Sequence, residues 1–462
     1  MRGFEDGAMR GGVPPRLGRF VLSMIYAKFI LATSRRALYP FAPEVGRAAG
    51  VSEQTVAFTL AVMQICYALV PLLVPALARA KCAGPDATLV GACALFALAQ
   101  LVVGILGASS FAMFVACIGC FGVGKGLFDP MLQLKIRRLV RIPEQRSAVT
   151  ALIEISWGLS SLIGIPLSGF LMAAGFRLPF LAFGGLCVTA TVATALQLRR
   201  TRSEQQDDAA SAAAGAAEAA RQPPQAPASS TATAVASHAP VGALWLGMFA
   251  ACSATDCLFL NYGVWLEEDF GFSVVQVASA TFVVGAADLS AELFNSWLLA
   301  RRGVTTTRLI CAGHAGSVVA YLALPLLGRM GAAPGLVAAG FAIFSFEVTL
   351  VAMLGASSMI TSQRGGGGSN GGGGFVEAGA VCFQGLGRVV GTLVAPLVWR
   401  RCGGMLGVGL CGAGISLLAL ACSMWAWWAD AEPEEPDVTA KAALGEVATC
   451  EVEVVQKQAA AV

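Results

Sequence analysis

Two short stretches read alike 221 positions apart: GVSEQTVA at residues 50–57 and GFSVVQVA at residues 271–278. In each, the glycine permits a chain reversal, and the serine can cap a helix by accepting a hydrogen bond from a free backbone N–H. An apolar run follows directly in both places. The repeat predicts a chain of two similar halves, each of which restarts its second helix in the same way.

A second match lies further along each half. Residues 158–164 read GLSSLIG and residues 385–391 read GLGRVVG, and a proline follows each, at Pro166 and Pro396. Rows of small residues let neighbouring membrane helices approach closely, and a proline bend can be accommodated there. Two ordered matches at nearly one offset argue against chance similarity between glycine-rich helices.

The composition around these repeats indicates a membrane protein. Of the 462 residues, 56% are hydrophobic and 13% are charged, whereas soluble proteins carry about 25% charged residues. The apolar runs are roughly 20 residues or longer, which matches the hydrocarbon thickness of a bilayer at 1.5 Å rise per residue. We therefore predict an all-α membrane protein of about 12 transmembrane helices in two pseudo-symmetric six-helix bundles.

The predicted spans are apolar runs bounded by polar or basic connections. They cover residues 17–41, 55–77, 88–107, 111–134, 148–174, 178–198, 242–266, 274–300, 309–327, 333–360, 375–399 and 405–428.

Three polar segments flank and separate the predicted halves, which cover residues 17–198 and 241–428. Residues 1–16 form an N-terminal tail, residues 199–240 form a disordered linker rich in small and polar residues, and residues 429–462 form an acidic tail. Lysine and arginine number 21 on the side of the membrane that holds both termini and seven on the other. This asymmetry predicts cytoplasmic termini, in the plasma membrane or an organelle membrane.

The two-half arrangement and several local stretches resemble the major facilitator superfamily. The stretches are YPFAP at residues 39–43, FDP at residues 128–130 and EISWG at residues 154–158. The resemblance implies a secondary active or facilitative transporter of a small solute that works by alternating access. The solute gradient or coupled protons would supply the energy. The alternative is a transporter-like membrane receptor or scaffold that binds a ligand without moving it.

One motif of that superfamily is degraded in this chain. The Gly-Asp-Arg-Gly-Arg-like connection after the second helix of each half survives as Arg79, Arg301 and Gly303, while Ala78 and Ala300 replace its aspartates. The resemblance implies that this connection latches the halves on the cytoplasmic side. We therefore treat the three surviving residues as candidate gate residues of a weakened latch.

Charged residues inside the spans are the candidates for substrate binding or ion coupling. Each costs roughly 2.5 to 3.5 kcal/mol to insert, so it should face a cavity or a partner. The candidates are Lys28, Arg35, Lys125, Asp129, Glu154, Asp256, Asp288, Glu292, Glu347 and Arg388.

The first span carries a cationic stripe. Lys28 and Arg35 are seven residues apart and share a helix face, while Arg36 points about 100° away. The stripe could attract an anionic substrate or pair with acids across the bundle. Alternatively, Arg35 and Arg36 extend to the outer membrane interface.

Spacing also predicts partners for several charges. Lys125 and Asp129 are four apart and should form an internal pair. A pair between Asp256 and Arg35 or Arg36 is one cross-bundle hypothesis. Another pairs Glu347 with Arg388.

Asp288 and Glu292 are four apart and face the same way. Two carboxylates this close repel each other in a low dielectric, so one of them can carry a proton. Alternatively, they interlock with Arg301, Arg302 or helix ends near the cytoplasm.

Other classes of function lack support in the sequence. Cys117 and Cys120 form a C-x-x-C with no second ligand pair, and residues 119–126 resemble a phosphate-binding loop but end in glycine inside an apolar helix. No H-E-x-x-H motif is present, and the net charge of +3 gives no sign of nucleic-acid binding. We expect no enzymatic activity, no cofactor and no metal, and a monomer whose partners are a solute, protons and the lipid bilayer.

Overall fold

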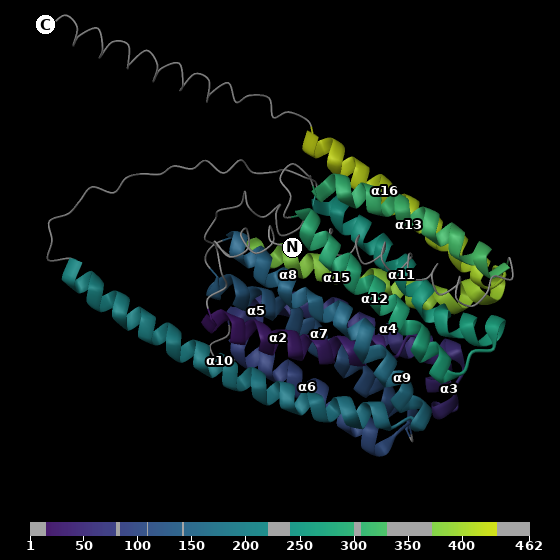
Figure 1. The fold of residues 1–462 in the computed structure, drawn as a ribbon, viewed down its shortest axis with the longest axis horizontal. Coiled ribbons are helices and arrows are strands. Elements are labelled where there is room, and N and C mark those ends of the chain that lie inside the picture. Colours follow the sequence, from purple (N-terminus) through teal and green to yellow (C-terminus); the bar gives the residue numbers. More distant parts are fainter. Residues whose placement is uncertain are drawn as a thin grey trace, which may run out of the picture.

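The computed structural model describes residues 15–79, 84–108, 110–140, 143–219, 241–299, 306–329 and 372–431. Within these residues, eleven helices are long and apolar enough to cross a membrane. Figure 1 shows them packed side by side as a bundle. The all-α membrane fold of two related halves is confirmed; the predicted tenth span, residues 333–360, lies outside the described residues.

The first half contains the spans predicted for it, several of them interrupted. Its elements are α2 (Pro15–Arg36), α3 (Ala42–Ala49), α4 (Glu53–Leu69), the 3₁₀ turn η2 (Val70–Leu73), α5 (Val74–Arg79), α6 (Pro85–Leu106), α7 (Phe111–Leu139), α8 (Pro143–Leu159), the π turn η3 (Ser160–Gly164), α9 (Ile165–Ala174) and α10 (Leu178–Ala219).

The first span ends earlier than predicted. Helix α2 stops at Arg36 instead of Phe41, because Pro40 lacks a backbone N–H and disfavours helical geometry in the residue before it. The chain then turns, with the Tyr39 amide bonded to the Arg36 carbonyl at 3.2 Å, and α3 begins. This break places Tyr39 and Pro40 beside the other half.

The sixth helix is longer than predicted. Helix α10 continues to Ala219 instead of ending at Leu198, because alanine, glutamine and glutamate favour helix. Figure 1 shows its last part projecting beyond the bundle. The division into halves, linker and tails stays a prediction, since residues 220–240 of the linker lie outside the described residues.

The second half closely follows the predicted spans. Its elements are α11 (Val241–Phe270), α12 (Val274–Leu299), α13 (Thr306–Arg329), α15 (Gly372–Arg401) and α16 (Met405–Ala431).

The repeated turn before the second helix of each half has the same geometry in both. Gly50 and Gly271 have φ angles of 65° and 66°, which glycine adopts without a steric penalty. The Ser52 hydroxyl accepts from the Thr55 amide, and the Ser273 hydroxyl from the Gln276 amide, each at 3.4 Å. The predicted equivalence of the two helix starts is confirmed.

The glycine-rich stretches bring the halves together. The η3 turn and α9 pack against α12, and α15 packs against α4. A Cβ at Gly285 would overlap the backbone of Leu162, and one at Gly385 would overlap Ala68. The fifth helix of each half therefore lies against the second helix of the other.

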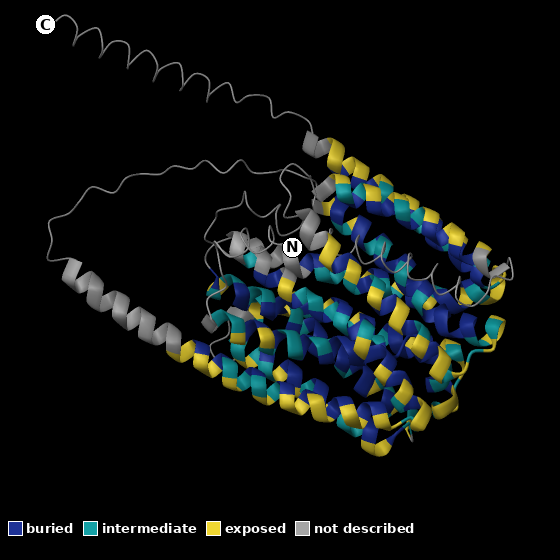
Figure 2. Ribbon diagram, in the orientation of Figure 1, coloured by how far each residue is buried: buried dark blue, intermediate teal, exposed yellow. Residues whose placement is uncertain are grey.

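The helix bundle has a buried interior and an exposed apolar perimeter, as a membrane fold requires. Figure 2 shows buried residues through its interior and exposed residues along its outer helices. Several of the outward side chains are large and apolar, including Leu22, Leu98, Leu196 and Leu417. A hydrocarbon solvent would cover this perimeter.

Candidate functional site

A cavity of about 80 Å³ lies between the halves. Helices α2, α8, α11 and α15 and the η3 turn all contribute to its wall. Its polar lining consists mainly of Arg35, Arg36, Tyr39, Ser161, Thr255, Asp256 and Arg388, and its aromatic lining of Trp157, Phe259 and Tyr262. A space of this size holds several water-sized groups, so a larger solute would require the walls to move apart.

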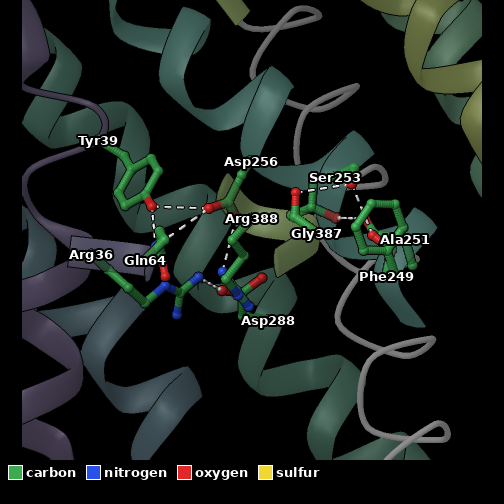
Figure 3. A network of polar contacts seen from close by, with 11 residues as sticks. Arg36, Tyr39, Gln64, Phe249, Ala251, Ser253, Asp256, Asp288, Gly387 and Arg388 are labelled. Carbon is green, nitrogen blue, oxygen red and sulfur yellow. Dashed lines mark hydrogen bonds and ion pairs between the residues drawn. The ribbon is translucent and has the colours of Figure 1, made fainter. Parts of the chain in front are cut away.

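The first polar cluster joins the two halves through Asp288. Its Oδ2 accepts from Arg36 Nη2 at 2.9 Å and from the Ser161 hydroxyl at 2.5 Å. Arg36 also donates to Ser161 and to the Trp157 carbonyl, and its guanidinium lies 4.4 Å from the centroid of the Trp157 ring. The first and fifth helices of the first half are thus bonded to α12 of the second half (Figure 3).

The second polar cluster is centred on Asp256 of α11. Its Oδ1 accepts from Arg388 Nη1 at 2.8 Å, within the second half. Its Oδ2 accepts from the Tyr39 hydroxyl at 2.9 Å and from Gln64 Nε2 at 3.5 Å, both in the first half. Gln64 Nε2 also donates to the Tyr39 hydroxyl. Figure 3 shows the group around one carboxylate, which therefore ties both halves together.

Two ion pairs between candidate residues stay within the first half. Lys28 Nζ lies 2.5 Å from Glu154 Oε2 and joins α2 to α8. Lys125 Nζ lies 2.7 Å from Asp129 Oδ1 on the same helix. The latter is the pair that the four-residue spacing predicts, whereas the partner of Glu154 was not predicted.

Arg35 differs from the other cations of the centre. Its side chain is buried, with 2% of the residue exposed, and its guanidinium carbon lies 4.5 Å from the centroid of the Tyr67 ring. Among the described residues, its Nε and Nη1 have no hydrogen-bond partner. The interpretation in which Arg35 and Arg36 extend to the membrane interface is therefore wrong, because both line the central cavity.

The structure changes several predicted pairings. Asp256 is paired with Arg388 instead of Arg35 or Arg36, and Asp288 is paired with Arg36. Glu292 is buried one turn beyond Asp288, and a Cβ at Gly158 would contact its Oε2.

Some predicted residues lie outside this description. Glu347, Arg301, Arg302 and Gly303 are not among the described residues, and Arg79 is the last residue of α5. The functional roles of these residues, and of the candidates that line the cavity, stay predictions. No cluster of residues with metal-ligand chemistry occurs within the described ranges.

Three residues of the site were missed from the sequence, namely Tyr39, Gln64 and Ser161, while Arg36 was considered only as a partner of Asp256 or as a residue at the membrane interface. Gln64 offered a signal, because an amide inside an apolar run needs a buried partner. Ser161 offered another, because the GLSSLIG and GLGRVVG repeat aligns it with Arg388.

Comparison with known proteins agrees with this architecture. Residues 24–369 match the family model described as Major Facilitator Superfamily. No curated protein matches the sequence.

Two solved structures share the fold. The human organic anion transporter MFSD10 (TETRAN) is 17% identical, with a TM-score of 0.63 over 89% of this chain and 100% of that one. A D-xylose-proton symporter is 13% identical, with a TM-score of 0.64 over 87% of this chain and 97% of that one. At these identities the likeness shows the fold alone.

Proposed function

The chain belongs to the major facilitator superfamily, and we propose that it carries a small solute across a membrane by alternating access, with the central cavity as its binding site. The observation that supports this most strongly is the cavity's position between the halves, near the middle of α11 and α15. In transporters built from repeats, rocking of one half against the other exposes such a site to each side in turn.

The contacts between the halves define what this rocking must separate. Near the cavity these are Arg36 with Asp288 and Tyr39 with Asp256. At the end of the bundle away from the termini, where Figure 1 shows α3, Arg47 Nη1 lies 3.2 Å from Glu267. Opening toward that end would break the outer contact and the inner ones together.

We propose protons as the coupling ion and Asp288 as the acid that carries them. Protonation would remove the charge that holds Arg36 and Ser161, so proton binding would loosen the contact between the halves. Glu292 supplies a second buried carboxylate one turn away. The similar fold of a protein named as a proton symporter supports this choice.

The test is transport in proteoliposomes over a panel of sugars, amino acids, organic anions and cationic drugs, with and without a pH gradient. We expect saturable uptake of at least one class, faster with the gradient. Saturable binding without flux would favour the receptor alternative.

Neutral variants of the buried acids test proton coupling separately from solute binding and transport. Asp288→Asn should lose the response to the pH gradient while still binding solute. If neutral variants of Glu154, Asp256, Asp288 and Glu292 all keep gradient-driven uptake, proton coupling through these acids is wrong.

A further inference from the structure

We propose that the cavity binds a small monovalent organic anion, and that the Arg35 guanidinium holds its carboxylate. This inference deepens the proposed function by naming the substrate class. It stands on the geometry around Arg35, on the charge balance of the cavity and on the apolar character of its walls.

The Arg35 side chain is positioned as an anion receptor. Its guanidinium carbon lies 4.5 Å from the centroid of the Tyr67 ring, a cation–π contact that helps to hold the group in place. Arg35 lines the cavity, and its Nε and Nη1 have no hydrogen-bond partner among the described residues. Each of these nitrogens shares an edge of the guanidinium with Nη2, and either edge presents two parallel donors that match the two oxygens of a carboxylate.

Among the described residues, the charged side chains that line the cavity leave one cation in excess. Arg36 is paired with Asp288, and Arg388 with Asp256. Arg35 lines the same cavity with no carboxylate within ion-pair distance among the described residues. A single negative charge on the solute would balance it, because a buried charge is stable when it is paired and hydrogen-bonded.

The neighbouring acids do not balance the charge of Arg35. Lys28 and Glu154 neutralise each other, as do Lys125 and Asp129. Glu292 does not line the cavity and borders Gly158.

The remaining walls favour an organic body over an inorganic ion. Trp157, Met248, Phe259 and Tyr262 line the cavity beside Arg35. Aromatic and thioether side chains bury apolar surface and offer few partners to a fully hydrated ion. The volume of about 80 Å³ restricts this body to a small one in the described conformation.

The test compares acids with their neutral amides on the purified full chain in detergent. The probes are lactate, benzoate and octanoate against lactamide, benzamide and octanamide. A ligand that binds the native state raises the melting temperature. We expect at least one acid to raise it saturably, with its amide at least about tenfold weaker, because the amide cannot form a charge-assisted bidentate pair.

Variants of Arg35 test whether the acid binds at this side chain. Arg35→Gln should weaken the acid at least about tenfold, and Arg35→Lys less, because lysine keeps the charge and loses the planar fork. Arg200→Gln, which changes an exposed arginine on α10, should bind like the wild type. If Arg35→Gln does not fold, Arg35→Lys and the acid-to-amide ratio of the wild type carry the test.

The outcomes separate this inference from the proposed function. If no acid binds, if amides bind equally, or if the Arg35 variants bind the acid like the wild type, the anion site is wrong. If the acid binds through Arg35 but no flux occurs in proteoliposomes, the proposed anion site is supported and the proposed transport is contradicted. If solute flux is unchanged in the Arg35 variants, the proposed transport is supported and the proposed anion site is contradicted.

Discussion

Two groups of polar contacts at the centre of the molecule differ in what they connect. The inter-half contacts join Arg36 to Asp288 and Tyr39 to Asp256. The intra-half pairs, such as Lys28 with Glu154, lie within one bundle. In the proposed alternating-access cycle, a rocking motion would break the first group of contacts and leave the second intact. Under this proposal, polar contacts of the same kind would act as a switch between the halves and as structural support within one half.

The difference in pairing coincides with a sequence difference at one position of the repeat. Ser161 of the first half occupies the repeat position of Arg388 in the second. Arg388 gives Asp256 a cation within its own half. The first half has only a hydroxyl there, and its cation, Arg36, bonds to Asp288 across the interface. The half with an arginine at this position keeps its ion pair internal, and the half with a hydroxyl there forms its ion pair across the interface.

The largest effect is expected from breaking the inter-half ion pair. Asp288→Asn leaves Arg36 buried without its anion, and removing one partner of a buried pair costs about 3–5 kcal/mol. We expect gradient-driven uptake in proteoliposomes to fall roughly 100-fold. Uptake within a factor of about two of the wild type would contradict the assignment of this pair as a switch. Asp86→Asn, whose acid pairs with Lys135 within the first half, is the matched control.

The intra-half pair between Lys28 and Glu154 should behave differently. Lys28→Met alone should lower the free energy of unfolding by roughly 2 kcal/mol, because Glu154 keeps some solvent contact. The double variant Lys28→Met with Glu154→Gln should regain most of that stability and keep transport, because neither charge is left unpaired. Melting temperature and uptake are the measurements. A double variant that is stable but inactive would place this pair in the transport cycle.

These differences show what could be predicted from the sequence. Hydropathy located the spans because a bilayer constrains length and polarity, and the repeated glycines identified the two halves. Partners across helices could not be predicted, since they depend on how each helix is rotated about its axis. Asp256 was therefore assigned to the wrong arginine, and Tyr39 was overlooked because it follows a break that hydropathy does not register.

Glycine substitutions extend the comparison of intra-half and inter-half contacts to helix packing. A Cβ at Gly387 would overlap the Phe249 carbonyl within the second half, and a Cβ at Gly285 would overlap Leu162 across the interface. Gly387→Ala should lower stability by about 1–3 kcal/mol, because overpacking within a half persists in every conformation. Gly285→Ala should melt nearer to the wild type and slow transport about tenfold. Equal melting temperatures for the two variants would contradict this distinction.

The smallest effect is expected at the surface. Arg47 contacts Glu267 across the interface at 3.2 Å, and 56% of its side chain is exposed. Exposed ion pairs contribute little because water and salt screen them. Arg47→Gln should change the uptake rate less than about twofold at physiological salt. A larger loss at that salt would show that this pair contributes more than its exposure allows.

Gly263 of α11 lies against the Pro40 carbonyl so closely that a Cβ would overlap it. A single methyl group at this position would act as a wedge between α11 and the turn after α2, because a backbone carbonyl cannot rotate out of the way as a side chain can. Gly263→Ala would therefore bias the protein toward conformers in which this end is parted. Such a variant would be a practical starting point for capturing a conformer that is open at this end for structure determination.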